Sequence, residues 1–198
     1  GDTFRHEMYE DYKANRAAMP DDLIPQIEPI HEVIKALGIK IFVVDGVEAD
    51  DVIGTLAAQA EQKGISTIIS TGDKDLAQLV TKNIKLVNTM KNEVLDIKGV
   101  EKKFGVKPEQ IVDYLALVGD TSDNIPGVEK VGPKTAVNWL TEHNDIDTII
   151  EKADEFKGKV GEYLRAGIEQ LKLSRQLTEI KKDVKLDFGI EDLAVGER

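Results

Sequence analysis

The sequence contains no cysteine, which excludes disulfide bonds, cysteine-ligated zinc sites and thiol nucleophiles, and suits a reducing compartment. It has no run of eighteen apolar residues, no signal peptide and no low-complexity tract, so we expect a soluble, non-secreted protein. Its three histidines, His6, His31 and His143, are scattered and form no ligand pattern. No nucleophile elbow, HExxH or GxGxxG motif occurs, which removes the common signatures of several enzyme classes.

Acidic residues outnumber basic ones, 37 to 26, and the net charge of −11 argues at first against nucleic acid as a partner. That argument fails if the acids are concentrated at a metal site while the bases lie elsewhere. Apolar residues make up 41% of the 198, enough to bury a core in one domain or in one domain with a small appendage. The placement of the charges therefore matters more than their sum.

The first half of the chain alternates apolar strand patterns with helical ones. β-Branched runs predict buried strands, and apolar residues at helical spacing between residues 52 and 60, followed by Gly64, predict a helix. This alternation is typical of an α/β fold, with a parallel sheet flanked by helices. We expect strands over residues 39–44, 65–70 and 83–88, a short helix over 76–80, and a hairpin partner at 93–96.

From about residue 97 the pattern becomes helical. We therefore predict two domains: an α/β core over residues 1–96 and an all-helical subdomain with a tail over 97–198. Pro108 marks one helix start. Further helices are expected near residues 132–140, 145–153 and 161–177, and a terminal strand and tail over 183–198.

Three acidic clusters follow strands or lie at helix ends. The carboxyl ends of parallel strands share one sheet edge, so we expect the first two clusters to meet there. Mg²⁺ takes oxygen ligands, and a pair of such ions needs a carboxylate-rich pocket. The alternative is that these acids are caps, salt bridges or solvated surface. The clusters are Glu48, Asp50 and Asp51; Asp73 and Asp75; and Asp120 and Asp123.

The stretch NIPGVEKVGPKTA, residues 124–136, approaches a phosphate-binding Walker A loop, but Pro133 interrupts the Gly-Lys junction and no strand precedes it. It fits a helix-hairpin-helix better. In that motif Gly127 and Gly132 let the backbone approach DNA, and helix-start amides hold a phosphate. Lys130 and Lys134 add charge without reading bases. The alternative is a plain helix connection with two turn glycines.

The N-terminal segment interleaves basic and aromatic residues: Arg5, Lys13 and Arg16 with Phe4, Tyr9 and Tyr12. This mixture fits contact with phosphates and unstacked bases. An ordinary solvated amphipathic helix is the alternative.

Four segments, taken in order, resemble the 5'-nuclease domain of bacterial DNA polymerase I: TFRHEMYEDYKANR, VEADDVIGTLA, TGDKDLAQLV and LALVGDTSDNIPGVEKVGPKTA. This is the family of flap endonucleases and 5'-3' exonucleases, whose fold is PIN-like. The resemblance implies two Mg²⁺ or Mn²⁺ ions on all seven acids named above, a K⁺ ion at the helix-hairpin-helix, and catalytic contacts of Lys13 and Arg16 with the scissile phosphate. The DNA-binding residues that it implies are Arg5, Tyr9, Tyr12, Lys13, Arg16, Gly127, Lys130, Gly132, Lys134 and Thr135.

The resemblance further implies as partners a DNA with a 5' flap, nick or RNA primer and a polymerase domain in the same parent chain, with no membrane, in the bacterial cytoplasm near the nucleoid. The family's first strand segment, with two aspartates, has no counterpart here. We therefore expect a fragment with impaired activity. A stand-alone flap endonuclease and a non-catalytic DNA-binding module are the alternatives. An aspartate-dependent phosphatase is disfavoured because no strand ends in DxDx[TV].

Overall fold

A three-stranded sheet forms the centre of the first half of the chain in the computed structural model, which describes residues 2–195. Strands β1 (Thr67–Ser70) and β2 (Ile84–Asn88) are parallel, with Thr67 opposite Ile84, and β3 (Glu93–Leu95) pairs antiparallel with β2. The predicted α/β fold and the β2–β3 hairpin are confirmed. The antiparallel β3 makes the sheet mixed.

Helix α3 (Ala49–Gln62) covers the sheet next to β1 and carries the first acidic cluster at its N-terminus. Its buried face includes Leu56, Ala57 and Ala60, which follow the helical period. The chain then turns at Gly64, whose φ of +67° belongs to the left-handed region that favours glycine. A 3₁₀ helix, Asp75–Leu79, follows β1 and is buried under α3.

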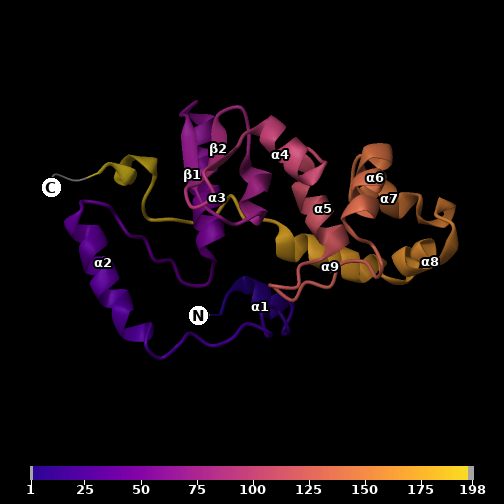
Figure 1. The fold of residues 1–198 in the computed structure, drawn as a ribbon, viewed down its shortest axis with the longest axis horizontal. Coiled ribbons are helices and arrows are strands. Elements are labelled where there is room, and N and C mark those ends of the chain that lie inside the picture. The colour runs from indigo at the N-terminus through magenta and orange to yellow at the C-terminus, as the bar shows by residue number, and fades with distance from the viewer. Residues whose placement is uncertain (1, 196–198) are drawn as a thin grey trace.

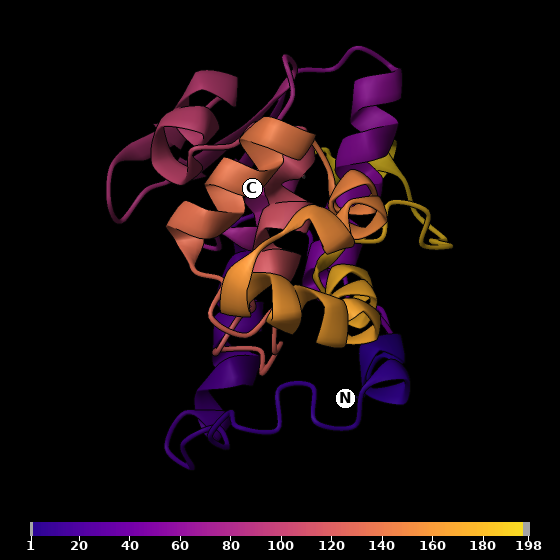
Figure 2. The same ribbon diagram turned by 90° about the vertical axis from the view of Figure 1, so that its right-hand side faces the viewer.

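The second half is helical, as predicted, and packs on the same core (Figures 1 and 2). Helix α5 contacts both α6 and α9, and one continuous apolar cluster runs from the sheet into these helices. Because the core is shared, the two halves are packed together. The helices are α4 (Ile97–Phe104), α5 (Ile111–Val118), α6 (Pro133–His143), α7 (Ile146–Glu151), α8 (Gly158–Ala166) and α9 (Ile168–Thr178).

The N-terminal segment forms a short helix α1 (Phe4–Met8), a series of turns and then α2 (Ile27–Ala36). It does not form the single amphipathic helix considered from the sequence. Helix α2 stands away from the rest of the molecule (Figure 1) and exposes apolar side chains such as Ile30 and Val33. Within residues 2–195, no helix is both long and apolar enough to cross a membrane.

Two strand predictions are wrong. Residues 39–44 have no regular secondary structure and pair with no strand in the described part of the chain, and Val43 is 80% exposed. Residues 183–195 contain only a 3₁₀ helix, Ile190–Leu193, and no strand, while residues 196–198 lie outside the described residues. An apolar β-branched run becomes a strand only where a neighbour supplies hydrogen-bonding partners.

The connection between α5 and α6, residues 119–132, carries the third acidic cluster. It is held by a pair of hydrogen bonds between Asp120 and Ile125 and by Gly127, at φ +65°. A Cβ at Gly127 would lie 2.5 Å from the backbone nitrogen of Gly119, so no larger residue fits there. At Gly132 a Cβ would meet no atom within 4 Å. The two glycines therefore differ: Gly127 is required by packing and Gly132 faces open space.

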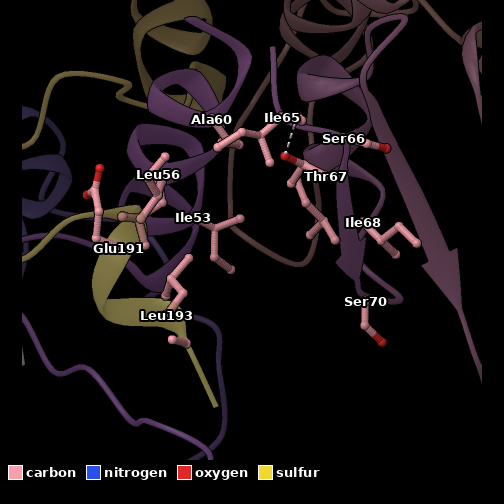
Figure 3. A pocket seen from close by; sticks show the side chains of 14 residues that line it. Ile53, Leu56, Ala60, Ile65, Ser66, Thr67, Ile68, Ser70, Glu191 and Leu193 are labelled. Atoms are coloured by element: carbon pink, nitrogen blue, oxygen red, sulfur yellow. Dashed lines mark hydrogen bonds between the residues drawn. The ribbon is translucent and has the colours of Figure 1, made fainter. Parts of the chain in front are cut away.

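A hollow of about 680 Å³ lies between α3 and β1, bordered by the 3₁₀ helix Ile190–Leu193 (Figure 3). Its walls are mainly apolar and include Ile53, Leu56 and Ile65. None of the acids in the three clusters lines it. The hollow is thus separate from the candidate site.

Candidate metal and nucleic-acid site

The first acidic cluster occupies the N-terminus of α3. Glu48 is the N-cap residue, with extended φ and ψ, and its backbone N–H donates to the side chain of Asp51 at 2.9 Å. A helix N-terminus carries partial positive charge, which favours carboxylates there. Local chain geometry thus explains why three acids are tolerated within four residues.

Arg5 is the most fully bonded cation of the site. Its side chain is 2% exposed, and its guanidinium donates to both oxygens of Asp51, at 2.7 and 2.8 Å. It also donates to the backbone carbonyls of Leu177 and Glu179, at 2.9 and 2.7 Å. The contact joins the N-terminal segment, α3 and the end of α9.

Both oxygens of Asp51 already accept hydrogen bonds. Besides the two bonds from Arg5, it accepts N–H bonds from Glu48 and from Lys181, the latter at 2.9 Å. Four hydrogen bonds fill the acceptor capacity of a carboxylate. These bonds, acting against burial, lower the pKa of Asp51. In this arrangement Arg5 and Asp51 bind each other, and metal binding by Asp51 and DNA contact by Arg5 stay predictions.

Glu48 and Asp123 come together around three side chains of the N-terminal segment. The Tyr12 hydroxyl lies 3.2 Å from Glu48 and 3.3 Å from Asp123. Lys13 forms an ion pair with Glu48 and lies 3.5 Å from Asp123, while Arg16 pairs with Asp123 at 2.5 Å. Tyr12 is buried in this arrangement, and its contact with DNA stays a prediction. Lys13 and Arg16 remain partly open to solvent, with side chains 18% and 55% exposed.

Backbone conformation fixes the position of Lys13. Its φ is +59°, which few non-glycine residues adopt, and its N–H donates to the carbonyl of Asp123 at 3.0 Å. Asn15 and Asn124 add side-chain bonds between the same two segments. Strain of this kind is often found at functional sites, where the surrounding contacts stabilise it.

The second and third clusters meet at Lys74. Asp73 and Asp75 follow β1, and the backbone N–H of Asp75 donates to Asp73 at 3.0 Å. The Lys74 ammonium pairs with Asp120 at 2.6 Å, and Asp120 also accepts the N–H of Ser122 at 2.7 Å. Lys74 was not singled out from the sequence. Its position between two acids in GDKD was the only available signal.

Two carboxyl groups of the site have raised pKa values. Burial, followed by the charges of Asp73 and Glu48, raises the pKa of Asp50 to about 6. Burial, followed by the charge of Asp73, raises the pKa of Asp75 to about 7. The charge of Asp120 acts on Asp75 in the same direction. The clusters are therefore close enough to repel one another.

The donor chemistry fits a divalent cation. Oδ1 of Asp75 is buried and has no hydrogen-bond partner, which is a costly state for a carboxylate oxygen. Oxygen donors around such an atom are what Mg²⁺ or Mn²⁺ requires. Within residues 2–195, however, no three acidic or histidine side chains are already arranged to hold one ion. Lysine and arginine side chains pair with several of the carboxylates instead.

The second half of the predicted helix-hairpin-helix, residues 124–136, lies at the start of α6. Gly132 is its N-cap residue and Pro133 its first residue, while Lys130 and Lys134 are exposed and Thr135 is half-buried. Tyr9 is half-buried against the small cluster of Tyr12, Ile125 and Leu177. DNA contacts of these residues stay predictions.

The raised pKa of Asp75 predicts a pH-dependent stability of the metal-free protein. Because the folded pKa exceeds the unfolded one, the folded state keeps a proton that the unfolded state releases, and stability falls as pH rises from about 4 to about 7. Asp75→Asn should therefore raise the free energy of unfolding by roughly 2–4 kcal/mol at pH 8 and by less at pH 5. Urea unfolding in EDTA measures this, with the exposed Asp187→Asn as control. Equal effects at both pH values would contradict it.

Two family models match the chain: "5'-3' exonuclease, N-terminal resolvase-like domain" over residues 1–105, and "5'-3' exonuclease, C-terminal SAM fold" over residues 106–198. Among curated relatives, the 5'-3' exonuclease of Aquifex aeolicus is 44% identical, over 98% of this chain and 66% of its own length. The 5'-3' exonuclease of Buchnera aphidicola is 38% identical, over 96% of this chain and 69% of its own. DNA polymerase I of Pseudomonas aeruginosa is 49% identical over the whole of this chain, which spans only 22% of that relative.

Solved structures agree in fold. The D15 protein of bacteriophage T5, co-crystallised with metal ions, superposes with a TM-score of 0.79 at 25% identity, over 91% of this chain and 73% of its own. The catalytic core of Rad2 in complex with DNA substrate has a TM-score of 0.53 at 16% identity, over 92% of this chain and 64% of its own, which shows the fold alone. From the family models and the relatives together, the chain belongs to the 5'-3' exonuclease family.

Proposed function

We propose that this chain is the structure-selective 5'-nuclease domain of a DNA polymerase I or of a stand-alone exonuclease, hydrolysing phosphodiesters of 5' flaps and RNA primers on bacterial chromosomal DNA. The observation that carries the proposal is the buried, unpartnered Oδ1 of Asp75, with Asp73, Asp120 and Asp123 near enough to raise its pKa, while Asp73 also acts on Asp50 of the first cluster. Relatives of both kinds support it, and so does the T5 5'-exonuclease, solved with divalent zinc at 25% identity and a TM-score of 0.78.

Six carboxylates would hold the metal: Glu48, Asp50, Asp73, Asp75, Asp120 and Asp123. Two divalent ions, Mg²⁺ or Mn²⁺, would supply an activated water and charge stabilisation for phosphoryl displacement. Asp51 supports this set without joining it, because it holds the N–H of Glu48 and the guanidinium of Arg5. That leaves Glu48 fixed at the α3 N-terminus, with its carboxylate on the side of Tyr12 and Lys13.

Lys13 and Arg16 would contact a phosphate. Both belong to the turns after α1, lie against Asp123, and keep part of their side chains in solvent. Arginine matches phosphate oxygens with a planar fork and lysine with a compact charge. A DNA strand entering here would bring its backbone between these cations and the acids. We infer that these two residues orient the phosphate beside the carboxylates.

A second contact would hold the duplex at the start of α6. The first amides of a helix lack partners within the helix and attract anions. The open space at Gly132 lets a phosphate approach them, and Lys130 and Lys134 flank it with exposed charge. None of these groups reads a base edge, so this grip would be independent of sequence.

Cleavage is tested with a single-turnover assay on DNA carrying a labelled 5' flap. We expect product with Mg²⁺ or Mn²⁺ and none in EDTA, and a rate lowered by ~10²–10³ in Asp73→Asn, since a preorganised charge-stabilising group is lost. The exposed Asp187→Asn is the matched control. An Asp73→Asn rate equal to that of the control would favour a non-catalytic DNA-binding module instead.

The duplex grip is tested by binding. Lys130→Ala with Lys134→Ala should weaken binding to duplexes of different sequence about equally and lower the slope of log K against log salt by up to ~2, because two phosphate contacts disappear. Fluorescence anisotropy at several salt concentrations measures both quantities. Lys152→Ala with Lys157→Ala, two exposed lysines of the same helical half, is the control. An unchanged slope in the first pair would refute the grip.

A further inference from the structure

Lys74 occupies the place where the second and third acidic clusters meet. Its ammonium lies 2.6 Å from Oδ2 of Asp120, a residue only 6% exposed, while the lysine side chain itself is 46% exposed. The other oxygen of Asp120 accepts the N–H of Ser122. Asp120 therefore already has a cation, and that cation is tethered to the loop bearing Asp73 and Asp75.

A divalent ion cannot share Asp120 with this ammonium at low cost. An ion coordinated by Oδ2 would sit about 2 Å from that oxygen, and the ammonium would remain within a few ångström of a double positive charge. Like charges at such separations repel by several kcal/mol even when partly screened, which a flexible lysine relieves by rotating into solvent. Binding of metal to Asp120 thus requires that Lys74 leave.

Lys13 repeats the arrangement between the first and third clusters. Its ammonium pairs with Glu48 and lies 3.5 Å from Asp123. Arg5, by contrast, is fully bonded and buried, so it has no route to solvent. The acidic site therefore contains one permanent cation, Arg5, and three partly exposed cations that can move: Lys74, Lys13 and Arg16.

We propose that Lys74 and Lys13 are resident counter-cations, which neutralise Asp120, Glu48 and Asp123 in the metal-free protein and are displaced when divalent ions bind. The inference rests on the proposed function, because it takes these acids as the metal ligands, and it makes metal binding a competition with the chain's own lysines. Without these lysines, the site would bind divalent ions more tightly, and the protein would be less stable when no divalent ion is bound.

Lys74 is the residue to test, since it has no assigned contact with DNA. Lys74→Met keeps the aliphatic stem and removes the charge. Lys74→Arg keeps the charge. Lys103→Met is the matched control, because Lys103 forms a comparable surface pair with Glu93 at 2.7 Å and its loss changes the net charge equally. Mn²⁺ affinity is measured by isothermal titration calorimetry, and the Tm by circular dichroism in EDTA and in Mn²⁺.

The proposal predicts that Lys74→Met binds Mn²⁺ about tenfold more tightly than the wild type, because one competing charge at short range is gone. Lys74→Arg and Lys103→Met should stay within about threefold of the wild type. In EDTA, Lys74→Met should have a lower Tm than Lys103→Met, and Mn²⁺ should remove that difference. Lys74→Gln replaces Lys74→Met if the latter does not fold in EDTA.

The outcomes distinguish a failure of the counter-cation role from a failure of the proposed function. Mn²⁺ binding by the wild type with unchanged or weaker binding by Lys74→Met overturns the counter-cation role and leaves the metal site intact. Tightening of the same size in Lys103→Met also overturns it, since net charge would then explain the effect. A wild type that binds no Mn²⁺ overturns the proposed function itself.

Discussion

The buried pair of Arg5 and Asp51 is the interaction on which the rest of the site depends. It connects the N-terminal segment, the start of α3 and the end of α9, which are far apart in the sequence. Asp51 in turn holds the N–H of Glu48, so the pair sets where the first acidic cluster begins. Removing one partner of such a pair leaves a buried charge uncompensated, which costs ~3–5 kcal/mol. The acids can be crowded because this contact, rather than the acids themselves, supplies local stability.

Repulsion among the remaining carboxylates opposes the stability that the Arg5–Asp51 pair supplies. The pKa values of Asp50 and Asp75 are raised by burial and by neighbouring acids, and one oxygen of Asp75 is buried without a partner. Lys13, Arg16 and Lys74 lie on the other carboxylates. A site arranged in this way keeps mutual repulsion at Asp50 and Asp75. Folding is therefore supported by packing and the Arg5 pair, and function would use the unsatisfied charge.

The sequence predicted those parts of the fold that local pattern determines. Periodicity located α3 and its end at Gly64, and the β-branched runs located β1 and β2. The same pattern at residues 39–44 predicted a strand wrongly, because pairing depends on a neighbour that local sequence does not specify. Asp50 and Asp51 are adjacent acids that the sequence alone does not distinguish. Because successive residues of a helix point about 100° apart, the two side chains have different surroundings. The buried partners of Arg5 and Tyr12 are distant in sequence, so local pattern could not predict these contacts.

The central claim is that the Arg5–Asp51 pair fastens α3 to α9 and the N-terminal segment. A double-mutant cycle with Arg5→Met, Asp51→Leu and the double variant, followed by urea unfolding in EDTA, measures it most directly. The account predicts that each single variant loses ~3–5 kcal/mol and that the double variant loses much less than their sum, since no buried charge remains. Losses that add, or single variants within about 1 kcal/mol of the wild type, would contradict it.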